Sequence, residues 1–294
     1  MGTGAGRMSP VPRKRAAGKT SLPNPALSLI RVIPPFPSLL VSAVTMAIAL
    51  LAINEPETGS VIVLGLGMLC FQFAIGLAND IVDAADDAKS KPWKAIPRGV
   101  LSRQAAIAAS AGLAGAGLII TSGLPFLAWL IGMAGLACGL IYDVQLKRTG
   151  LSWLPVAMAL PLVPVWVFSA FDAWDRLLWW VFPLGGLLGL ALHLANQLPD
   201  LEAEKGAKGA AHRLGARRSF RGSVGVFGVA GGMACVVLLL AGEPGRAALC
   251  AVSTVFGGSL SGRAVVLFGR DGLFGLLAAS AGAIAVVFLS AMGS

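Results

Sequence analysis

Four carboxylates follow an uncharged apolar segment, residues 61–78, of this 294-residue chain: Asp80, Asp83, Asp86 and Asp87. Asn79, Asp83 and Asp87 recur every four residues, and Asp80 lies one turn before Asp83. Because a helix has about 3.6 residues per turn, these side chains would share one helix face. Carboxylates at this spacing repel one another, and near a helix C-terminus they also meet the negative end of its dipole. The pattern therefore predicts a cation-binding site.

A second stretch, between residues 193 and 213, repeats the pattern. Asn196, Asp200 and Glu204 have the same spacing and again follow an apolar run. Basic residues come after each copy, at Lys89, Lys91, Lys94 and Arg98 after the first and at Lys205, Lys208 and Arg213 after the second. Mg²⁺ prefers carboxylate oxygens together with phosphate oxygens and water. A layered order of acid, metal, phosphate and base would satisfy every charge, so the two clusters predict a Mg²⁺–diphosphate site; solvated helix ends are the alternative.

The elements that position these clusters are predicted to be membrane-spanning helices. The chain is 56% hydrophobic and only 13% charged, whereas a soluble domain carries roughly 25% charge. Its apolar runs are about twenty residues long, which suits helices rather than the alternating strands of a barrel. We expect an all-α integral membrane protein with nine transmembrane helices in a bundle, at about 36–53, 61–82, 104–122, 125–142, 152–171, 177–198, 223–242, 246–267 and 272–292.

The acidic motifs end the second and sixth predicted spans, which indicates two four-helix units plus a ninth helix. Of the 23 Lys and Arg residues, 21 fall in the N-terminal stretch and in alternate loops, and the exceptions are Arg176 and Arg246. The positive-inside rule then places the N-terminus in the cytoplasm and the C-terminus outside it. We expect residues 1–35 to be a basic, disordered cytosolic tail and residues 36–294 to be the transmembrane domain.

The net charge of +9 follows from this distribution of cations. A basic cytosolic face suits contact with the anionic inner leaflet of the lipid bilayer, for which we expect a bacterial cell membrane. The charge gives no support to nucleic-acid binding. The sequence does not indicate the oligomeric state.

Other side chains in the apolar runs suggest interfacial and functional positions. An aromatic belt at the outer membrane face is expected from Trp166, Trp174, Trp179 and Trp180. His193 lies one turn before Gln197 on the acidic face of the sixth predicted span. A protonatable residue within a span is a functional candidate, and a packed histidine is an equal alternative.

The two acidic motifs resemble those of the UbiA superfamily of intramembrane prenyltransferases. "NDIVDAADD" (79–87) is similar to the family's N-D-x-x-D-x-x-x-D motif. "NQLPDLEAE" (196–204) is similar to its second motif, D-x-x-x-D, with a glutamate in the last place. These paired motifs identify the superfamily and leave the subfamily open.

Two loops extend the resemblance. "YDVQLKRTGLSWLP" (142–155) resembles the family's loop with Tyr and Lys after the fourth helix. "KAIPRGVLS" (94–102) resembles its (R/K)-P-I-x-x-G-x-(I/L)-S segment, with Ala95 where proline is usual. The resemblance covers about residues 25–292.

The resemblance implies transfer of a polyprenyl group from a polyprenyl diphosphate to a lipophilic or aromatic acceptor at the cytosolic membrane face, with Mg²⁺-assisted ionisation of the diphosphate. Two Mg²⁺ ions are implied, with Mn²⁺ as an alternative ion. One ion would be held by Asn79, Asp80, Asp83 and Asp87, and the other by Asn196, Asp200 and Glu204. The implied catalytic residues are Asp83, Asp87, Asp200, Tyr142 and Lys147. The implied contacts to the diphosphate are Lys94, Arg148, Lys205 and Arg213.

Other functions stay open at the level of sequence. A multi-span secondary transporter could use the acidic clusters for cation coupling, although such sites normally lie at the membrane midplane. A CDP-alcohol phosphatidyltransferase is disfavoured because Ala84, rather than glycine, follows Asp83. A non-catalytic scaffold is a third alternative. The sequence identifies neither the acceptor nor the prenyl chain length, and it assigns no role to Asp86 or Asp143.

Overall fold

A computed structural model describes residues 35–201 and 209–292 of the chain. The predicted N-terminal tail therefore lies outside the described residues, apart from Pro35. The α-helices are α2 (Pro35–Ala52), α3 (Thr58–Ser90), α4 (Arg103–Ile120), α5 (Phe126–Ile141), α6 (Trp153–Ala170), α7 (Val181–Asn196), α8 (Ala210–Leu214), α9 (Ala216–Leu240), α10 (Pro244–Phe268) and α11 (Arg270–Leu289).

The described residues form an all-helical membrane protein, which confirms the predicted fold class. Eight of the helices are long and apolar enough to cross a membrane, and a shorter apolar helix, Pro37–Ala52, accompanies them within the described part of the chain. A helix satisfies all of its internal backbone hydrogen bonds within one segment, which is what the interior of a bilayer requires.

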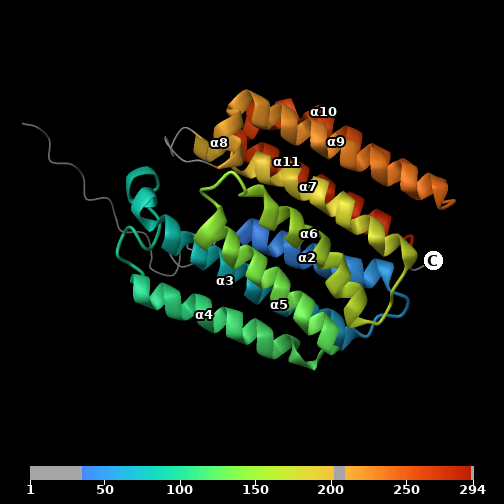
Figure 1. Cartoon of the computed structure of the whole chain (residues 1–294), viewed down its shortest axis with the longest axis horizontal. Helices are drawn as coiled ribbons and strands as arrows, with labels where there is room; N and C mark the ends of the chain where they lie inside the picture. The colour runs from blue at the N-terminus through green and yellow to red at the C-terminus, as the bar shows by residue number, and fades with distance from the viewer. Residues whose placement is uncertain (1–34, 202–208, 293–294) are drawn as a thin grey trace, which may run out of the picture.

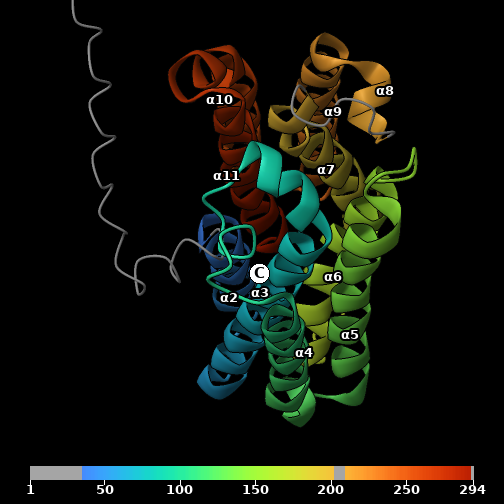
Figure 2. The same cartoon turned by 90° about the vertical axis from the view of Figure 1, so that its left-hand side faces the viewer.

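The long helices lie roughly side by side in one bundle (Figures 1 and 2). Most helices pack against the next long helix in the chain, and α11 returns to contact α7 and α2. Figure 2 places α4 and α5 at one edge of the bundle and α9 and α10 at the opposite edge. The first four-helix unit is α2–α5, the second is α6, α7, α9 and α10, and α11 is the additional helix.

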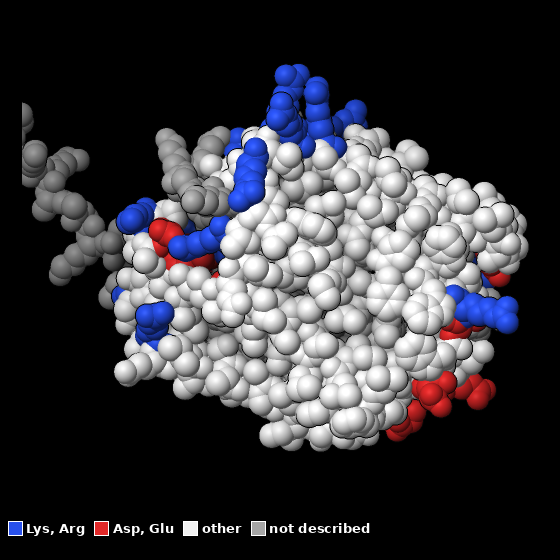
Figure 3. Space-filling view, in the orientation of Figure 1, with Lys and Arg blue, Asp and Glu red and all other residues white. Residues whose placement is uncertain are grey.

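Charged side chains lie at the left end, along the upper edge and at the right end of the view in Figure 3, and uncharged residues cover the broad surface between the two ends. At the left end of this view, Lys and Arg side chains surround acidic ones. An uncharged band between two charged ends is the surface that a bilayer would cover. The acid-rich end of α3 lies at one of these ends, outside the apolar band.

Helix α3 is longer than the predicted second span. It continues from Thr58 to Ser90, eight residues beyond the predicted end at residue 82. Residues 83–90 contain no helix-breaking residue, and the first proline comes at Pro92. All four acidic residues of the first cluster therefore lie on regular helix.

The position of Trp166 differs from the prediction. Its side chain is only 2% exposed and packs against Phe71, with the ring centroids 6.0 Å apart. Gly132 leaves room for the indole, because a Cβ there would lie 3.0 Å from Trp166 Nε1. Trp166 is therefore a core residue, and the exposed tryptophans of the expected belt are Trp174, Trp179 and Trp180.

Glycines on α7 allow it to pack closely against α6. A Cβ at Gly189 would lie 2.8 Å from the Cα of Ala157 and from the carbonyl oxygen of Val156. A Cβ at Gly185 would lie 2.9 Å from the backbone nitrogen of Pro161. Small residues of this kind let the backbones of membrane helices approach each other closely.

We expect Gly189→Ala to destabilise the protein, because the added methyl group meets backbone atoms that cannot rotate away. Overpacking of this kind costs about 1–3 kcal/mol. Gly186→Ala is the matched control, since a Cβ at Gly186 meets only the Ala157 carbonyl oxygen, at 3.8 Å. Thermal unfolding in detergent should show a lowered midpoint for Gly189→Ala alone. Equal midpoints for the two variants would contradict this account of the α6–α7 contact.

Candidate functional site

The first acidic cluster forms a compact layer of ion pairs with the loop that follows α3. The side chains of Asp80, Asp83 and Asp87 are all buried. Lys94 Nζ donates hydrogen bonds to Asp80 Oδ1 and Asp87 Oδ2, each 2.7 Å long. A single ammonium group thus spans two carboxylates seven residues apart on the same helix face.

The turn between α3 and α4 brings Lys94 back over α3. The neighbouring Ala95 is buried and packs against Leu77. Its carbonyl oxygen accepts hydrogen bonds from the backbone nitrogens of Val100, at 3.0 Å, and Leu101, at 3.2 Å. Burial alone would lower the pKa of Lys94, but the hydrogen bonds to the two carboxylates outweigh it and raise that pKa. Lys94 is therefore held in its charged form.

A π-helical turn, η2 (Tyr142–Leu146), follows α5 and supplies the second set of partners. Asn79 Nδ2 donates a 2.9 Å hydrogen bond to Asp143 Oδ1. One turn further along both elements, Lys147 Nζ donates to Asp83 Oδ2. The two pairs have the same sequence separation, so α3 and the end of α5 run parallel and in register here. The wide turn closes with the Lys147 N–H donating to the Tyr142 carbonyl oxygen over 2.7 Å; such turns often occur at functional sites.

Arg148 lies at the rim of the cluster. Its Nη2 is 2.7 Å from Asp86 Oδ2 and 3.5 Å from Asp83 Oδ1. Both Arg148 and Asp86 have about half of their side-chain surface exposed, at 52% and 46%. An exposed pair of this kind contributes little to stability, so the Arg148 side chain can leave Asp86 at low cost.

The oxygen atoms of the cluster fit a hard cation such as Mg²⁺. Asp83 Oδ1 and Asp143 Oδ2 are buried and accept no hydrogen bond from any residue that the structure describes. Within residues 35–201 and 209–292, no three His, Cys, Asp or Glu side chains converge closely enough to enclose a metal ion. Mg²⁺, however, usually takes only one or two carboxylates and fills its octahedron with water and phosphate oxygens. Asn79, Asp80, Asp83 and Asp87 could supply such ligands.

The second motif is described only in part. Asn196 is the last residue of α7, and Asp200 lies in a short 3₁₀ turn, η4 (Pro199–Leu201). Arg270 Nη1, at the start of α11, donates a 3.2 Å hydrogen bond to the carbonyl oxygen of Leu198 and so holds this segment. The side chain of Asp200 and the predicted ligand Glu204 lie outside the described residues.

Lys205 and Arg213 were also predicted to contact the diphosphate, and the structure describes only Arg213 of the two. Lys205 lies outside the described residues. Arg213, on the short helix α8, is exposed and packs over Gly150, where a Cβ would lie 2.7 Å from the guanidinium carbon. Arg213 therefore lies against the loop that carries Lys147 and Arg148. The segment after the second acidic motif therefore meets the loop after α5, whose Lys147 pairs with Asp83 of the first motif.

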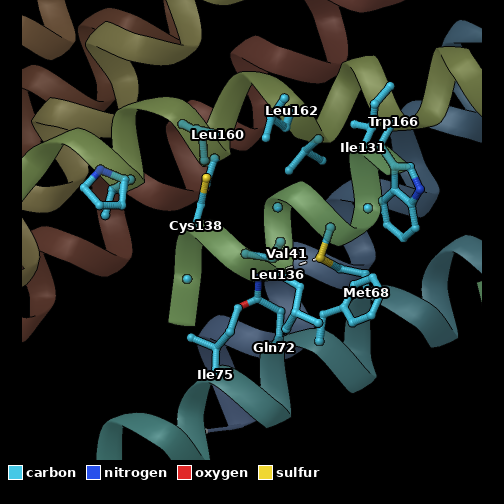
Figure 4. A pocket seen from close by; sticks show the side chains of 18 of the residues that line it. Val41, Met68, Gln72, Ile75, Ile131, Leu136, Cys138, Leu160, Leu162 and Trp166 are labelled. Carbon is cyan, nitrogen blue, oxygen red and sulfur yellow. Dashed lines mark hydrogen bonds between the residues drawn. The ribbon is translucent and has the colours of Figure 1, made fainter. Parts of the chain in front are cut away.

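Two apolar cavities share Tyr142, the residue directly before Asp143. Cavity 1, of about 240 Å³, lies between α3, α5 and α6, and Figure 4 shows the side chains around it. Cavity 2, of about 300 Å³, lies between α2, α6, α7 and α11. Tyr142 lines both cavities, and Asn196 lines cavity 2. Tyr142 directly precedes Asp143, the hydrogen-bond partner of Asn79, so the first motif approaches the cavities through η2, whereas the second motif borders cavity 2 directly.

His193 is packed and also lines cavity 2. Its Nε2 is 3.0 Å from the buried Ser152 Oγ, which also accepts a 3.1 Å hydrogen bond from the backbone nitrogen of Ala210. The rings of His193 and Tyr142 pack edge to face, with their centroids 5.7 Å apart. His193 thus links Tyr142 to the segment that follows the second motif.

Three residues of this region received no role from the sequence: Asp143, Ser152 and Gln72. Asp143 could have been found as an acid at the end of a span, directly after the chain's single tyrosine. Gln72 could have been found as a polar residue inside an apolar run, seven residues before Asn79. Ser152 has no signal in the sequence, because its role depends on a contact between distant loops.

Comparison with known proteins identifies the fold and the family of this chain. No curated protein matches the sequence significantly. A UbiA homologue from Archaeoglobus fulgidus bound to GPP and Mg²⁺ has a similar structure, with a TM-score of 0.71 at 14% identity over 88% of this chain and 99% of that one. An apo UbiA homologue from Aeropyrum pernix K1 gives 0.68 at 18% identity over 86% and 96%.

A structure of digeranylgeranylglyceryl phosphate synthase gives a TM-score of 0.65 at 15% identity, over 91% of this chain and 96% of that one. At these identities the likeness shows the fold alone. The sequence itself matches the UbiA prenyltransferase family over residues 39–273. This match spans most of the chain, and the chain therefore belongs to the UbiA prenyltransferase family.

Proposed function

We propose that this protein transfers a prenyl group from a polyprenyl diphosphate to a lipophilic acceptor, with Mg²⁺ bound at the acidic motifs. The observation that carries the proposal is the layer of paired acids and cations at the end of α3, next to Tyr142, which lines both apolar cavities. A diphosphate needs cations and metal ligands, whereas a prenyl chain needs an apolar channel. Lys147 and Asp83 meet the first requirement, and the apolar cavities lined by Tyr142 meet the second.

Support for the substrate comes from the family and from its solved members. One A. fulgidus homologue is bound to GPP and Mg²⁺, and another structure of it contains DMAPP and Mg²⁺. The first cluster of the present chain offers oxygen ligands of the same hard character. We therefore assign a prenyl diphosphate and Mg²⁺ to this site.

The metal ligands would be Asn79, Asp80, Asp83 and Asp87 in the first motif, with Asn196, Asp200 and Glu204 in the second. When bound, Mg²⁺ supplies positive charge that offsets the charge developing on the departing diphosphate. A second ion would be bound by the second motif. Mn²⁺, which also favours oxygen ligands, is the expected substitute.

The cations of the cluster act on the phosphate oxygens. Lys94, Lys147 and Arg148 each contact one or two carboxylates, and each can exchange these for phosphate oxygens without leaving the cluster. Charge-assisted hydrogen bonds to phosphate are stronger than neutral ones, and Arg can bind phosphate with two parallel bonds. Lys205 and Arg213 would add charge from the opposite side.

Tyr142 stands at the reacting end of the substrate in this arrangement. Its ring lines both cavities and lies within one turn of Asp143 and Lys147. An aromatic ring can stabilise a neighbouring positive charge through its π-electrons. Such stabilisation suits the allylic cation that forms as the carbon–oxygen bond to diphosphate breaks.

Cavity 2 suits the hydrocarbon chain of the substrate. Along α11 its lining runs from Phe274 to Leu289, a distance of about 22 Å at 1.5 Å per residue. Among the described residues that line it, the polar side chains are Tyr142, His193 and Asn196, all at the acidic end. A prenyl chain could extend from the cluster through most of the apolar band without meeting a polar group.

The orientation in the membrane is part of the proposal. If the distribution of Lys and Arg sets the topology, a reporter fused after Ser294 should report an extracytoplasmic position, and one inserted at Gly150 a cytoplasmic position. Paired alkaline phosphatase and green fluorescent protein fusions would measure this. A cytoplasmic C-terminus would mean that the number of crossings is even.

Metal dependence is the second test. Turnover of radiolabelled geranylgeranyl diphosphate should require Mg²⁺ or Mn²⁺ and fall to background in excess EDTA, because the carboxylates alone would repel diphosphate. Activity should return when Mg²⁺ is restored. Undiminished turnover in the presence of EDTA would exclude a metal-assisted reaction.

The two motifs can be weighed against each other by substitution. Asp83→Ala and Asp200→Ala should each abolish most turnover, and the double variant should be little worse, because residues that act as a unit are strongly non-additive. Asp86→Ala is the control, since Asp86 lies outside the motif and its pair with Arg148 is exposed. If Asp200→Ala turned over prenyl diphosphate normally, the second motif would be no more than a solvated helix end.

A further inference from the structure

Gln72 is a polar side chain inside the otherwise apolar lining of cavity 1. Among the described residues its one hydrogen bond runs from Nε2 to the sulfur of Met68, over 3.6 Å. A thioether is a weak acceptor, so the hydrogen-bonding capacity of the amide is largely unused. An amide without partners is unfavourable in apolar surroundings, and a polar residue within a membrane span indicates a functional position.

The position of Gln72 relates it directly to the acid cluster. It precedes Asn79 by seven residues, which places both on one face of α3, with Gln72 about 10 Å deeper in the bundle. Figure 4 shows the Gln72 side chain extending from α3 toward Leu136 of α5. A molecule in cavity 1 that contacts Gln72 can therefore also reach Tyr142 and the reacting end of the diphosphate.

The lining of cavity 1 differs from that of cavity 2 in two respects. It places an amide in the interior of the bundle, whereas the polar residues of cavity 2 lie only at its acidic end. The described residues around cavity 1 also include no Lys, Arg, His, Asp or Glu. Phe71 and Trp166 line it as well, and both are nearly fully buried. Cavity 1 therefore suits a compact apolar molecule that carries an oxygen and no charge.

We propose that cavity 1 binds the prenyl acceptor, that Gln72 hydrogen-bonds to an oxygen of it, and that the acceptor is an uncharged lipophilic molecule with a phenol, quinol or alcohol group. A carboxylate or phosphate in this cavity would lack a compensating cation in low-dielectric surroundings. This inference rests on the proposed prenyl transfer.

The reaction in this arrangement is a substitution. The C1–oxygen bond of the prenyl diphosphate breaks with its electron pair going to diphosphate, and an oxygen or carbon of the acceptor forms the new bond to C1. The proton that the acceptor loses passes to the released diphosphate. Neither an oxidant nor a reductant is consumed.

The first test concerns the charge of the acceptor. Lipids extracted from membranes of the source organism are separated by anion exchange into neutral and anionic fractions. Each fraction is added to the full-length protein in phosphatidylcholine vesicles with radiolabelled geranylgeranyl diphosphate and Mg²⁺. We expect labelled product from the neutral fraction. Product from the anionic fraction alone would overturn the inference while supporting the proposed function, and no product from either fraction would overturn both.

The second test concerns the cavity. Gln72→Met keeps the length of the side chain and removes the amide, so it should raise the KM for the active lipid fraction about 10-fold and leave the KM for geranylgeranyl diphosphate within about two-fold. Gln104→Met, the same change on the exposed surface of α4, is the control.

Gly135→Leu provides an independent variant. A Cβ at Gly135 meets no atom within 4 Å, so the added side chain enters cavity 1 without a backbone clash. It should also raise the KM for the lipid fraction while the melting temperature stays that of the wild type. If Gln72→Met and Gly135→Leu raised the KM for geranylgeranyl diphosphate instead, cavity 1 would hold the prenyl chain and the inference would be wrong.

Discussion

The pairing of buried carboxylates with cations at the end of α3 is the constraint on which the rest of the site depends. Asp80, Asp83 and Asp87 lie on one face of α3 and are buried, and buried charges are unfavourable without compensating partners. Lys94 and Lys147 supply these partners from two separate loops, so the cluster fixes the turn after α3 and the end of α5 together. Tyr142, which lines both apolar cavities, lies at the end of α5 that this pairing holds in place.

Much of this organisation could be predicted because membrane sequences carry strong local signals. Apolar runs of about twenty residues gave the helices, and the four-residue spacing of Asn79, Asp83 and Asp87 placed them on one face. The likeness between that motif and the one beginning at Asn196 led to the prediction of one site shared by two helices, which stays a prediction because the second motif is described only in part. Lys94 and Lys147 were predicted from the sequence to act on the diphosphate, and in the structure they lie directly on the carboxylates. The end of α3 was less predictable, since charge density alone does not end a helix.

The remaining features depend on contacts between distant parts of the chain. Trp166 was expected at the membrane surface because tryptophan favours interfaces, yet Gly132 opens a space for it beside Phe71. Ser152 forms hydrogen bonds with both His193 and the backbone of Ala210, and the local sequence around these residues does not indicate the contact. Asp143 was left unassigned because a single acid beside a tyrosine has many explanations. Its pairing with Asn79 becomes visible only when the parallel register of α3 and η2 is known.

Lys94, which bridges Asp80 and Asp87, would also affect how tightly the proposed site binds a metal ion. A free divalent ion must compete with an internal ammonium group for the same oxygens, whereas an ion that arrives with diphosphate offers the displaced lysine an anion in exchange. In the proposed function, metal and diphosphate would therefore be thermodynamically coupled, and each would raise the affinity for the other by the same factor. Such a site would respond weakly to the free ion and strongly to the metal–diphosphate complex, so its occupancy would follow the supply of prenyl donor rather than the concentration of the metal.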